Sequence, residues 1–342
     1  MKLKFIAALF AAVCAVSVPL LSGCKASTSF MLNTDEAGNK YYVVNCSGFS
    51  GSLQGEYAIP AYYGEGENRA PVTKIAEGGF TGTSITKLTV PETVTEVGNM
   101  AFAYNYQLKS VVFEEGSKLE ELGSGAFIGC TSLQSAQLPA SLKIIRRSAF
   151  EKCENLAVVN LPDGLESIGA AAFQNCSSLE EVVFPDKLIN IGRQAFYYAG
   201  LKKVVIPDSV RDTYESDGQT VIPAIGYAAF HSCTQLELAV VGNGIKTITE
   251  GAFGYCTSLK TLYLTASLER VEGARYSDGN FICGHAFHND AALSEIYYGG
   301  TAEQWQALKA NINSQEVRLG DEVFNNSALL NAEPQFEVVY GG

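Results

Sequence analysis

The sequence lacks the short motifs that mark most enzyme active sites. It contains no glycine-rich loop that would hold a phosphate, no Gly-x-Ser-x-Gly nucleophile elbow and no His-Glu-x-x-His zinc motif. No cleft with converging polar groups is suggested by any other pattern of acidic, basic or nucleophilic residues. We therefore predict no catalytic residue, no metal site and no cofactor, and we expect a binding protein that is not an enzyme.

Positive charge is also scarce. The chain has 24 Lys and Arg against 36 Asp and Glu, which gives a formal net charge of −12. An acidic surface repels phosphate backbones, so nucleic acid is excluded as a partner. At 47% hydrophobic residues the chain nevertheless has ample material for a buried core.

The longest hydrophobic run lies at the start of the chain. Lys2 and Lys4 precede an uncharged, mostly apolar run over residues 5–21, which ends in Leu-Ser-Gly-Cys at 21–24. This order is typical of a secretory signal peptide. The tetrapeptide also resembles the lipobox of bacterial lipoproteins, in which the cysteine, here Cys24, receives lipid and becomes the new N-terminus. An uncleaved membrane anchor is the alternative, which Pro19 and the small residues before Cys24 disfavour. We predict a signal peptide at 1–23, lipidation of Cys24, and a flexible tether at 24–40.

The rest of the chain is dominated by one repeating pattern. A Phe, usually preceded by Ala, recurs at spacings of 22 to 25 residues with two exceptions of 34. These anchor positions are Phe80, Phe102, Phe127, Phe150, Phe173, Phe196, Phe230, Phe253 and Phe287. A fixed period in the twenties indicates a solenoid, whose rungs share one core by stacking.

Within each rung the apolar positions are fixed. After Phe173 they are Leu179, Val182 and Phe184, whose spacing predicts a bend followed by a short strand with the last two side chains inward. Pro185 cannot donate to a strand ladder and therefore ends the strand. We assign residues 41–80 to an N-terminal cap and first repeat, 81–300 to repeats, and 301–342 to a C-terminal cap. In that last cap, the Thr301-x-x-Gln304 spacing predicts a capped helix, on which Trp305 closes the final apolar face.

The pattern resembles the BspA-type leucine-rich repeat of bacterial surface proteins. The resemblance covers residues 41–300 and rests on Cys-x-x-Leu, Leu-Pro and Ile-Gly-x-x-Ala-Phe within a 23-residue frame. It implies a right-handed leucine-rich-repeat solenoid, β-rich with short strands, turns and few helices. It also implies adhesion to host matrix proteins or other cells. With Cys24, it predicts an extracytoplasmic monomer, lipid-anchored at a bacterial surface, that binds a protein or glycan on a host or neighbouring cell.

Five cysteines occupy one position of the repeat, three residues after an anchor. They are Cys130, Cys153, Cys176, Cys233 and Cys256. Other rungs have Thr83, Asn105, Ala199 or Asp290 there, so we interpret this slot as a place for a small filler and expect free thiols. Disulfides between adjacent rungs are not excluded, because neighbouring strands lie only ~4.8 Å apart.

Two other clusters are interpreted as turn chemistry. Pro-Asp pairs recur in successive rungs, as at Asp163, Asp186 and Asp208, and Pro-Asp is an ordinary turn sequence. His285, His288 and Asp290 superficially resemble a metal site. Because Phe287 must point inward, its neighbours diverge around a bend, and we expect the histidines at the surface.

The outward side of the first strand of each rung offers a binding surface. Its central position, the outer row, is occupied in order by Thr89, Val112, Gln137, Asn160, Val183, Val205, Val240, Tyr263 and Tyr297. The row is apolar from Val183 onward, Leu238 widens it, and charged residues border it. Exposed apolar stripes with polar rims are often contact surfaces. The alternative is that Val and Tyr simply favour strands.

The two 34-residue spacings contain insertions in the same half of the chain, at 211–223 and 272–283. Each has a Tyr close to an Asp-Gly turn, at Tyr214 and Tyr276. Insertions in solenoids form surface loops, often on the binding side, although loops also grow without function. We predict partner contacts at Val183, Val205, Leu238, Val240, Tyr263, Tyr297, Tyr214 and Tyr276.

The competing hypothesis is a passive scaffold or coat protein that self-associates. Cys46 and Cys283 lie near opposite ends of the repeat array, too far apart to pair with each other. In a scaffold either one is a candidate for contacts between copies.

Overall fold

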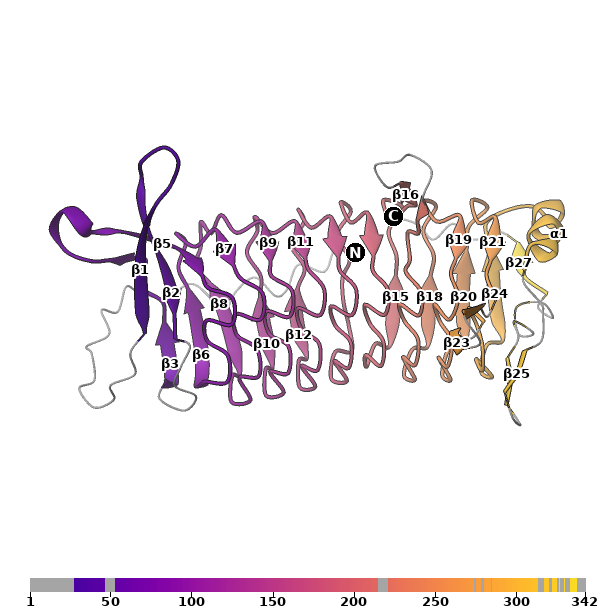
Figure 1. The fold of residues 1–342 in the computed structure, drawn as a ribbon. Helices are drawn as coiled ribbons and strands as arrows, with labels where there is room; N and C mark the ends of the chain where they lie inside the picture. Colours follow the sequence, from indigo (N-terminus) through magenta and orange to yellow (C-terminus); the bar gives the residue numbers. More distant parts are fainter. Residues whose placement is uncertain are drawn as a thin grey trace, which may run out of the picture.

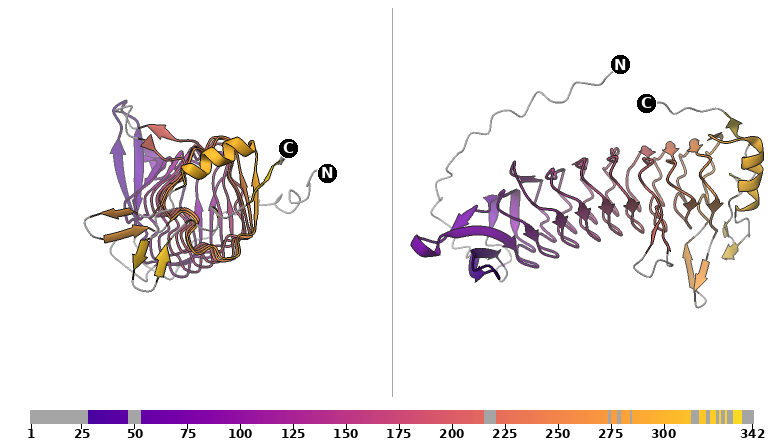
Figure 2. Two further views of the ribbon diagram at one scale, coloured as in Figure 1. Left: turned by 90° about the vertical axis from the view of Figure 1, so that its right-hand side faces the viewer. Right: turned by 90° about the horizontal axis from the view of Figure 1, so that it is seen from above.

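The computed structural model describes residues 28–46, 53–214, 221–273, 275–277, 280–283, 285–312, 317–319, 322–324, 326, 329 and 333–336. The backbone alone is described at 214, 275–277, 280–283, 317–319, 322–324 and 336. The chain forms an elongated stack of rungs, with the N-terminal strands at one end and helix α1 (Ala302–Ala310) at the other (Figure 1). Viewed along the stack, the rungs superimpose into one ring-like outline (Figure 2). This confirms the predicted leucine-rich-repeat solenoid.

One face of the stack, the long-strand face, is built from the first strand of each rung. Its N-terminal part contains β3 (Gln54–Ala58), β6 (Ser84–Val90), β8 (Ser110–Phe113), β10 (Ser135–Gln137) and β12 (Val158–Asn160). Its C-terminal part contains β15 (Lys203–Val205), β18 (Leu238–Val240), β20 (Thr261–Leu264), β24 (Glu295–Tyr298) and β27 (Gln335–Phe336). All these pairs are parallel, as stacking of like on like requires.

A second face, the short-strand face, follows the turn after the long strand, which holds a proline in several rungs. Its two-residue strands are β7 (Glu96–Val97), β9 (Glu121–Leu122), β11 (Ile144–Ile145), β13 (Ser167–Ile168), β14 (Asn190–Ile191), β19 (Thr247–Ile248) and β21 (Arg270–Val271). At the N-terminal end this sheet continues into β5 (Ala70–Ile75), β2 (Lys40–Asn45) and β1 (Ser29–Thr34), and β4 (Tyr62–Tyr63) pairs with β5. The remaining side of each rung is a turn that carries the anchor Phe.

The anchor phenylalanines form one continuous stack through the core. All nine are at most 1% exposed, and successive ring centroids lie 5.2 to 5.5 Å apart. From Phe102 to Phe287 the ring planes stay within 12° of each other. Such aromatic pairs contribute about 0.5–1.5 kcal/mol each beyond the burial of their area. The 23-residue period therefore places each anchor ring against the anchor ring of the next rung.

The backbone around each anchor is fixed by contacts between rungs. The N–H of Phe150 donates to the carbonyl of Ala172 at 2.8 Å, and the same step is repeated from Phe80 to Phe253. In most rungs the residue two positions before the anchor and the residue two positions after it both have φ near +60°. Several of these residues are not glycine, among them Ala171 and Asn175, so the uniform turn of the repeat carries backbone strain at these positions.

The cysteine slot makes a hydrogen bond that sequence reasoning missed. Each thiol donates to the carbonyl of the anchor Phe one rung earlier at 3.2 Å, as Cys153 does to Phe127. Asn105 donates to Phe80 in the same way at 2.9 Å. Cys46 and the five slot cysteines are buried and free, as the prediction of free thiols required. Burial raises the pKa of Cys130 to about 12, so this thiol stays protonated and able to donate.

The N-terminal end differs from the prediction. Residues 24–40 were expected to form a flexible tether, but Ser29–Thr34 is strand β1, paired antiparallel with β2 along its whole length. The sequence hid this strand because Phe30, Met31 and Leu32 are consecutive and show no alternation, and of these three only Phe30 packs onto the core. The 3-10 helix η1 (Gly66–Asn68) completes the cap. Cys24 and the predicted signal peptide lie outside the described residues.

The C-terminal cap follows the prediction where it is described. Thr301 and Gln304 form the expected capping box at the start of α1. Trp305 is 1% exposed, and its ring lies 5.2 Å from that of Tyr298 on the last rung. Asn326 replaces the missing next rung, since its Oδ1 accepts a hydrogen bond from the Phe287 N–H at 3.1 Å. A short hairpin of β25 (Val317–Leu319) and β26 (Glu322–Phe324) lies between α1 and Asn326 in the sequence.

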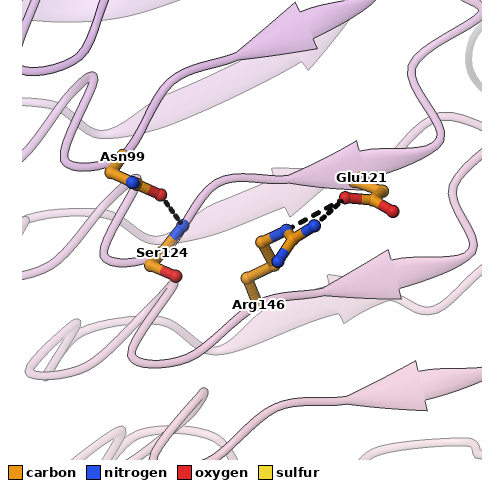
Figure 3. A network of polar contacts seen from close by, with 4 residues as sticks. All are labelled: Asn99, Glu121, Ser124 and Arg146. Atoms are coloured by element: carbon orange, nitrogen blue, oxygen red, sulfur yellow. Dashed lines mark hydrogen bonds and ion pairs between the residues drawn. The ribbon is translucent and has the colours of Figure 1, made fainter.

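Polar side chains also join neighbouring rungs along the short-strand face. Figure 3 shows two such ties: the Ser124 N–H donates to Asn99 Oδ1 at 3.0 Å, and Arg146 Nε donates to Glu121 at 2.9 Å. Similar exposed pairs join Lys74 to Glu96, Lys143 to Glu120 and Lys246 to Glu269. Because they are solvent-exposed, each contributes about 0–1 kcal/mol.

Candidate binding surface

The predicted outer row exists as a register of aligned residues. In the C-terminal part, Val205, Val240, Tyr263 and Tyr297 are successive partners on β15, β18, β20 and β24. In the N-terminal part, Thr89, Val112, Gln137 and Asn160 are aligned in the same way. The alternation of inward and outward residues therefore follows the sequence pattern.

Exposure within the row is less uniform than expected. Val183 is 75% exposed and Val205 38%, but Val240 is only 8% exposed and Leu238 is half-buried. Val240 is aligned between Val205 and the larger Tyr263 in the register of the sheet. The expectation that Val240 offers contact surface was therefore wrong.

Two tyrosines form the best-ordered part of the surface. The rings of Tyr263 and Tyr297 lie 4.5 Å apart and within 8° of parallel, and both are half-buried. On the same strands Thr261 Oγ1 donates to Glu295 Oε2 at 3.0 Å. The pair is thus a partly exposed stack of two aromatic rings on strands that also carry the charged side chain of Glu295.

The long-strand face is interrupted at Val183. Residues 181–184 belong to no strand, so β12 and β15 are not joined through this rung. The next rung has one residue fewer between its anchor and its first inward leucine, at Ala199-Gly200. A Cβ on Gly200 would lie 2.1 Å from the Ser177 carbonyl oxygen, so the chain is drawn tightly against the preceding rung here. We attribute the break to this shortening.

Another exposed residue was missed next to the break. Val158 on β12 is 63% exposed, but it lies one outward position before the outer row, aligned with Ser135. The sequence Val158-Val159-Asn160 was enough to predict this exposure, because side chains alternate along a strand and only the middle residue can point inward.

The two insertions form β-hairpins, which the sequence reasoning had described as loops. β16 (Thr213–Tyr214) pairs with β17 (Val221–Ile222), and β22 (Arg275–Ser277) pairs with β23 (Asn280–Cys283). Both leave the solenoid on the same side (Figure 2). The side chains of Tyr214 and Tyr276 lie outside the described residues, whereas Val221 and Ile222 are exposed.

The hairpins attach to the short-strand face and not to the outer row. β17 leads directly to Ile225, which bridges Ile191 of β14, and β22 directly follows β21. The outer row belongs to the other face of each rung. A single site formed by the hairpins and the row stays a prediction.

A row of aromatic rings on the turns was not anticipated. Tyr197 stacks on His231 at 5.1 Å, His231 contacts Tyr255 at 5.1 Å, and Tyr255 contacts His288 at 5.0 Å. Burial lowers the pKa of His231 to about 4, helped by nearby His288. Burial, together with His285, lowers the pKa of His288 to about 4 as well.

The histidines were expected at the surface, and this was wrong for two of them. His285 is fully buried and His288 nearly so. In the described residues, no group of three or more His, Cys, Asp or Glu is arranged to hold a metal ion. Cys46 is also buried, which removes it as a candidate for thiol contacts between copies, and the side chain of Cys283 is not described.

Asp290 occupies the cysteine slot of the last rung. Its Oδ1 accepts a hydrogen bond from the Cys256 N–H at 2.9 Å. Its side chain is only 2% exposed, and burial raises the pKa of this carboxyl well above its usual range.

Together these features define a repeat solenoid with exposed side chains on one sheet face. The family model for the BspA-type leucine-rich repeat region matches residues 68–157, 114–216 and 219–331. The chain belongs to the BspA-type leucine-rich repeat family.

Several solved structures are similar. A leucine rich cell surface protein from Faecalibacterium prausnitzii is 20% identical over 84% of this chain and 97% of its own, with a TM-score of 0.46. A leucine-rich repeat protein from Bacteroides ovatus is 20% identical over 84% and 98%, with a TM-score of 0.35. The T. pallidum leucine rich repeat protein is 23% identical over 68% and 78%, with a TM-score of 0.35. No curated protein matches the chain.

Proposed function

We propose that this chain is a lipid-anchored surface protein whose solenoid binds a protein or glycan on another cell, without catalysis. The observation that carries the proposal is the exposed C-terminal part of the outer row. Val205, Tyr263 and Tyr297 on the sheet, and Val183 at the break before it, leave apolar surface in contact with solvent on both sides of the buried Val240. Monomeric soluble proteins seldom expose continuous apolar surface without a use for it.

The contrast with the N-terminal part of the same face supports the proposal. There the row holds Thr89, Gln137 and Asn160, which offer polar groups on the same backbone. A stacked tyrosine pair supplies large contact area with few rotatable bonds, and tyrosine is enriched at the centres of interfaces. We therefore place the partner over β20 and β24.

The test replaces Tyr263 and Tyr297 with Ser, separately and together. Binding is measured against a panel of extracellular-matrix proteins and a glycan array. Both tyrosines are half-buried and stacked on each other, so either change should cost about 0.5–1.5 kcal/mol of stability, and affinities are compared only between variants that remain folded. Affinity for the partner found by the wild-type protein should fall by about 1–2 kcal/mol per residue.

Thr89→Ser and Gln137→Ser are the matched controls at the other end of the same row. They should leave affinity unchanged. Equal losses at both ends, or none at either, would contradict the proposed surface.

The anchor is tested at Cys24, the only cysteine at the end of the predicted signal peptide. Cys24→Ala should abolish incorporation of labelled fatty acid and leave the chain unprocessed or mislocalised. Incorporation that persists in the variant would refute lipidation at this residue. Within the described residues, no helix has both the length and the apolar composition to span a bilayer.

A further inference from the structure

Exposed apolar side chains gather at the N-terminal cap. Met31 and Leu32 on β1, and Tyr62 and Tyr63 on β4, are each 40 to 53% exposed. In both strands the two residues are consecutive, so they point to opposite faces of the sheet. Exposure on both faces at once is what an edge of a sheet shows when nothing covers it.

The cluster is held rigidly. The ring of Tyr63 stacks on Phe30 at 3.8 Å and meets Tyr42 edge-on at 5.1 Å. Tyr42 in turn donates its hydroxyl hydrogen to the Asn68 carbonyl at 3.0 Å. Tyr63 of β4, which pairs with β5, thereby contacts Phe30 of β1, and β1 is the terminal strand of its sheet.

The chain from Cys24 places this surface near a bilayer. Only five residue steps separate Cys24 from Ser29, the first residue of β1, and five steps span at most about 18 Å. The stack from Phe80 to Phe287 is eight steps of just over 5 Å, or roughly 40 Å. If Cys24 carries lipid, the cap lies at the membrane surface and Trp305 lies far from it.

We propose that the exposed edge formed by Met31, Leu32, Tyr62 and Tyr63 rests on the lipid bilayer at the level of the headgroups. This inference rests on the proposed lipid anchor and adds a second point of contact to it. Tyr favours the membrane interface, where an apolar ring and a polar end are both accommodated. At that depth water still reaches the free N–H and C=O groups of the β1 edge, which the hydrocarbon interior would leave unpaired.

The charge of the cap indicates which lipids it accepts. Residues 28–75 of the described chain include Lys40, Arg69 and Lys74 but a larger number of acidic residues. The acidic residues are Asp35, Glu36, Glu56, Glu65 and Glu67. Attraction to anionic headgroups therefore cannot drive the contact, and we expect it on zwitterionic phosphatidylcholine and at high salt.

The experiment uses the full lipidated chain in phosphatidylcholine vesicles that contain lipids brominated close to the headgroup. Tyr63→Trp supplies a fluorescent probe in the cap, and Tyr106→Trp is the matched control. Tyr106 is a tyrosine of similar exposure, 59%, on a rung beyond the cap. The natural Trp305, buried at the far end, contributes the same unquenched signal to both variants.

Bromine close to the headgroup should quench the additional fluorescence of Tyr63→Trp, because the probe would lie at interfacial depth, and should leave that of Tyr106→Trp unchanged. Unchanged melting temperatures show that both variants are folded. Quenching of both probes would mean that the solenoid lies flat on the bilayer, and quenching of neither would mean that the cap stands clear of it. Each result overturns the proposal while leaving the lipid anchor intact.

Two further outcomes are distinguishable. Protein that fails to float with the vesicles, and takes up no labelled fatty acid, refutes the anchor itself and with it the bilayer contact. If the fluorescence of Tyr63→Trp shows that the probe is shielded from solvent even without brominated lipid, and dilution of the protein removes that shielding, then a second copy covers the edge. This result also overturns the proposal.

Discussion

The middle rungs, from Phe127 to Phe196, and the last rungs, from Phe230 to Phe287, share one backbone but differ in what fills it. The middle rungs carry neutral slot residues, and the thiols of Cys130, Cys153 and Cys176 donate to carbonyls one rung earlier. The last rungs contain all three histidines of the chain and the buried carboxyl of Asp290. The repeat therefore constrains the backbone of each rung more strictly than the chemical type of the side chains that it carries.

This difference has a thermodynamic consequence. Burial raises the pKa of the slot thiols in the middle rungs, so these thiols stay protonated in both the folded and the unfolded state at acidic and neutral pH, and their contribution to stability is constant there. Groups whose pKa is shifted by burial make stability depend on pH. Because each rung contacts only its neighbours, such effects should remain local to the end of the stack that contains them.

The largest expected effect comes from cutting the phenylalanine stack. Phe173→Ala should lower the free energy of unfolding by about 3–5 kcal/mol, the usual cost for a large buried side chain. Phe173 has stacked neighbours on both sides, at 5.3 and 5.2 Å. Denaturant unfolding measures the loss, and a curve identical to wild type would mean that the anchors are not the core.

Phe287→Ala is the matched variant at the last rung. Its ring stacks on one anchor only, Phe253, at 5.5 Å. The loss of one aromatic pair instead of two should make this variant less destabilised by roughly 1 kcal/mol. Equal losses would show that the cap replaces the missing ring completely.

Acid should weaken the last rungs before the middle ones. The pKa values of His231 and His288 are about 4 in the folded chain against 6.5 ordinarily, so the unfolded state binds more protons between these values. Their stability contribution is thus complete above pH 6.5 and is lost as pH falls toward 4, by about 1–3 kcal/mol per histidine. Hydrogen exchange at pH 7 and pH 5 should show the loss in residues 230–290 first.

His231→Phe is the control, because it keeps an aromatic ring between Tyr197 and Tyr255 and cannot be protonated. The variant should lose a smaller part of its stability between pH 7 and pH 5 than the wild type. An unchanged pH dependence would show that His231 does not titrate in this range.

Asp290 should act in the opposite direction. Its pKa is raised in the folded chain, so the folded state retains a proton that the unfolded state gives up, and its penalty grows as pH rises above 3.8. Asp290→Asn removes that penalty and supplies an amide donor, as Asn105 does toward Phe80 in the same slot. We expect a gain of about 1–2 kcal/mol at pH 7 and none at low pH, measured by thermal unfolding. A loss at pH 7 would show that the carboxylate is held by a favourable contact.

Much of this architecture follows from the sequence, because a repeat shows each constraint several times. The anchors, the register of the outer row and the capping box at Thr301 were all predictable from spacing. Strand β1 was not, since an edge strand that occurs once has no repeat to reveal it. The burial of Val240 was also missed, because exposure depends on the neighbouring strands as well as on the residue itself.

The binding surface is the part that spacing predicts least well. Its residues are free to vary from rung to rung, so no period marks them. The hairpins were assigned to the outer row only because they occur in the same half of the chain. Their attachment beside β14 and β21 depends on where in the rung each insertion falls, which the chain order reveals only once the two faces are known.

The smallest expected effect tests the strained turns in both regions. Ala171 in the middle rungs and Ala228 in the last rungs have φ of 56° and 55°, which costs an L-residue with a Cβ about 1 kcal/mol or more. Glycine has no such penalty, and Gly125 and Gly251 occupy the same turn position in other rungs with φ of 62° and 61°. Glycine also loses more backbone entropy on folding and removes a small buried methyl group, so each Ala→Gly change should stabilise by only about 0.3 kcal/mol. Ala157→Gly, at an exposed position that is not among the residues with positive φ, should instead destabilise by a similar amount. Thermal unfolding of the three variants would show opposite signs if the repeat stores strain at these turns, and the same sign if it does not.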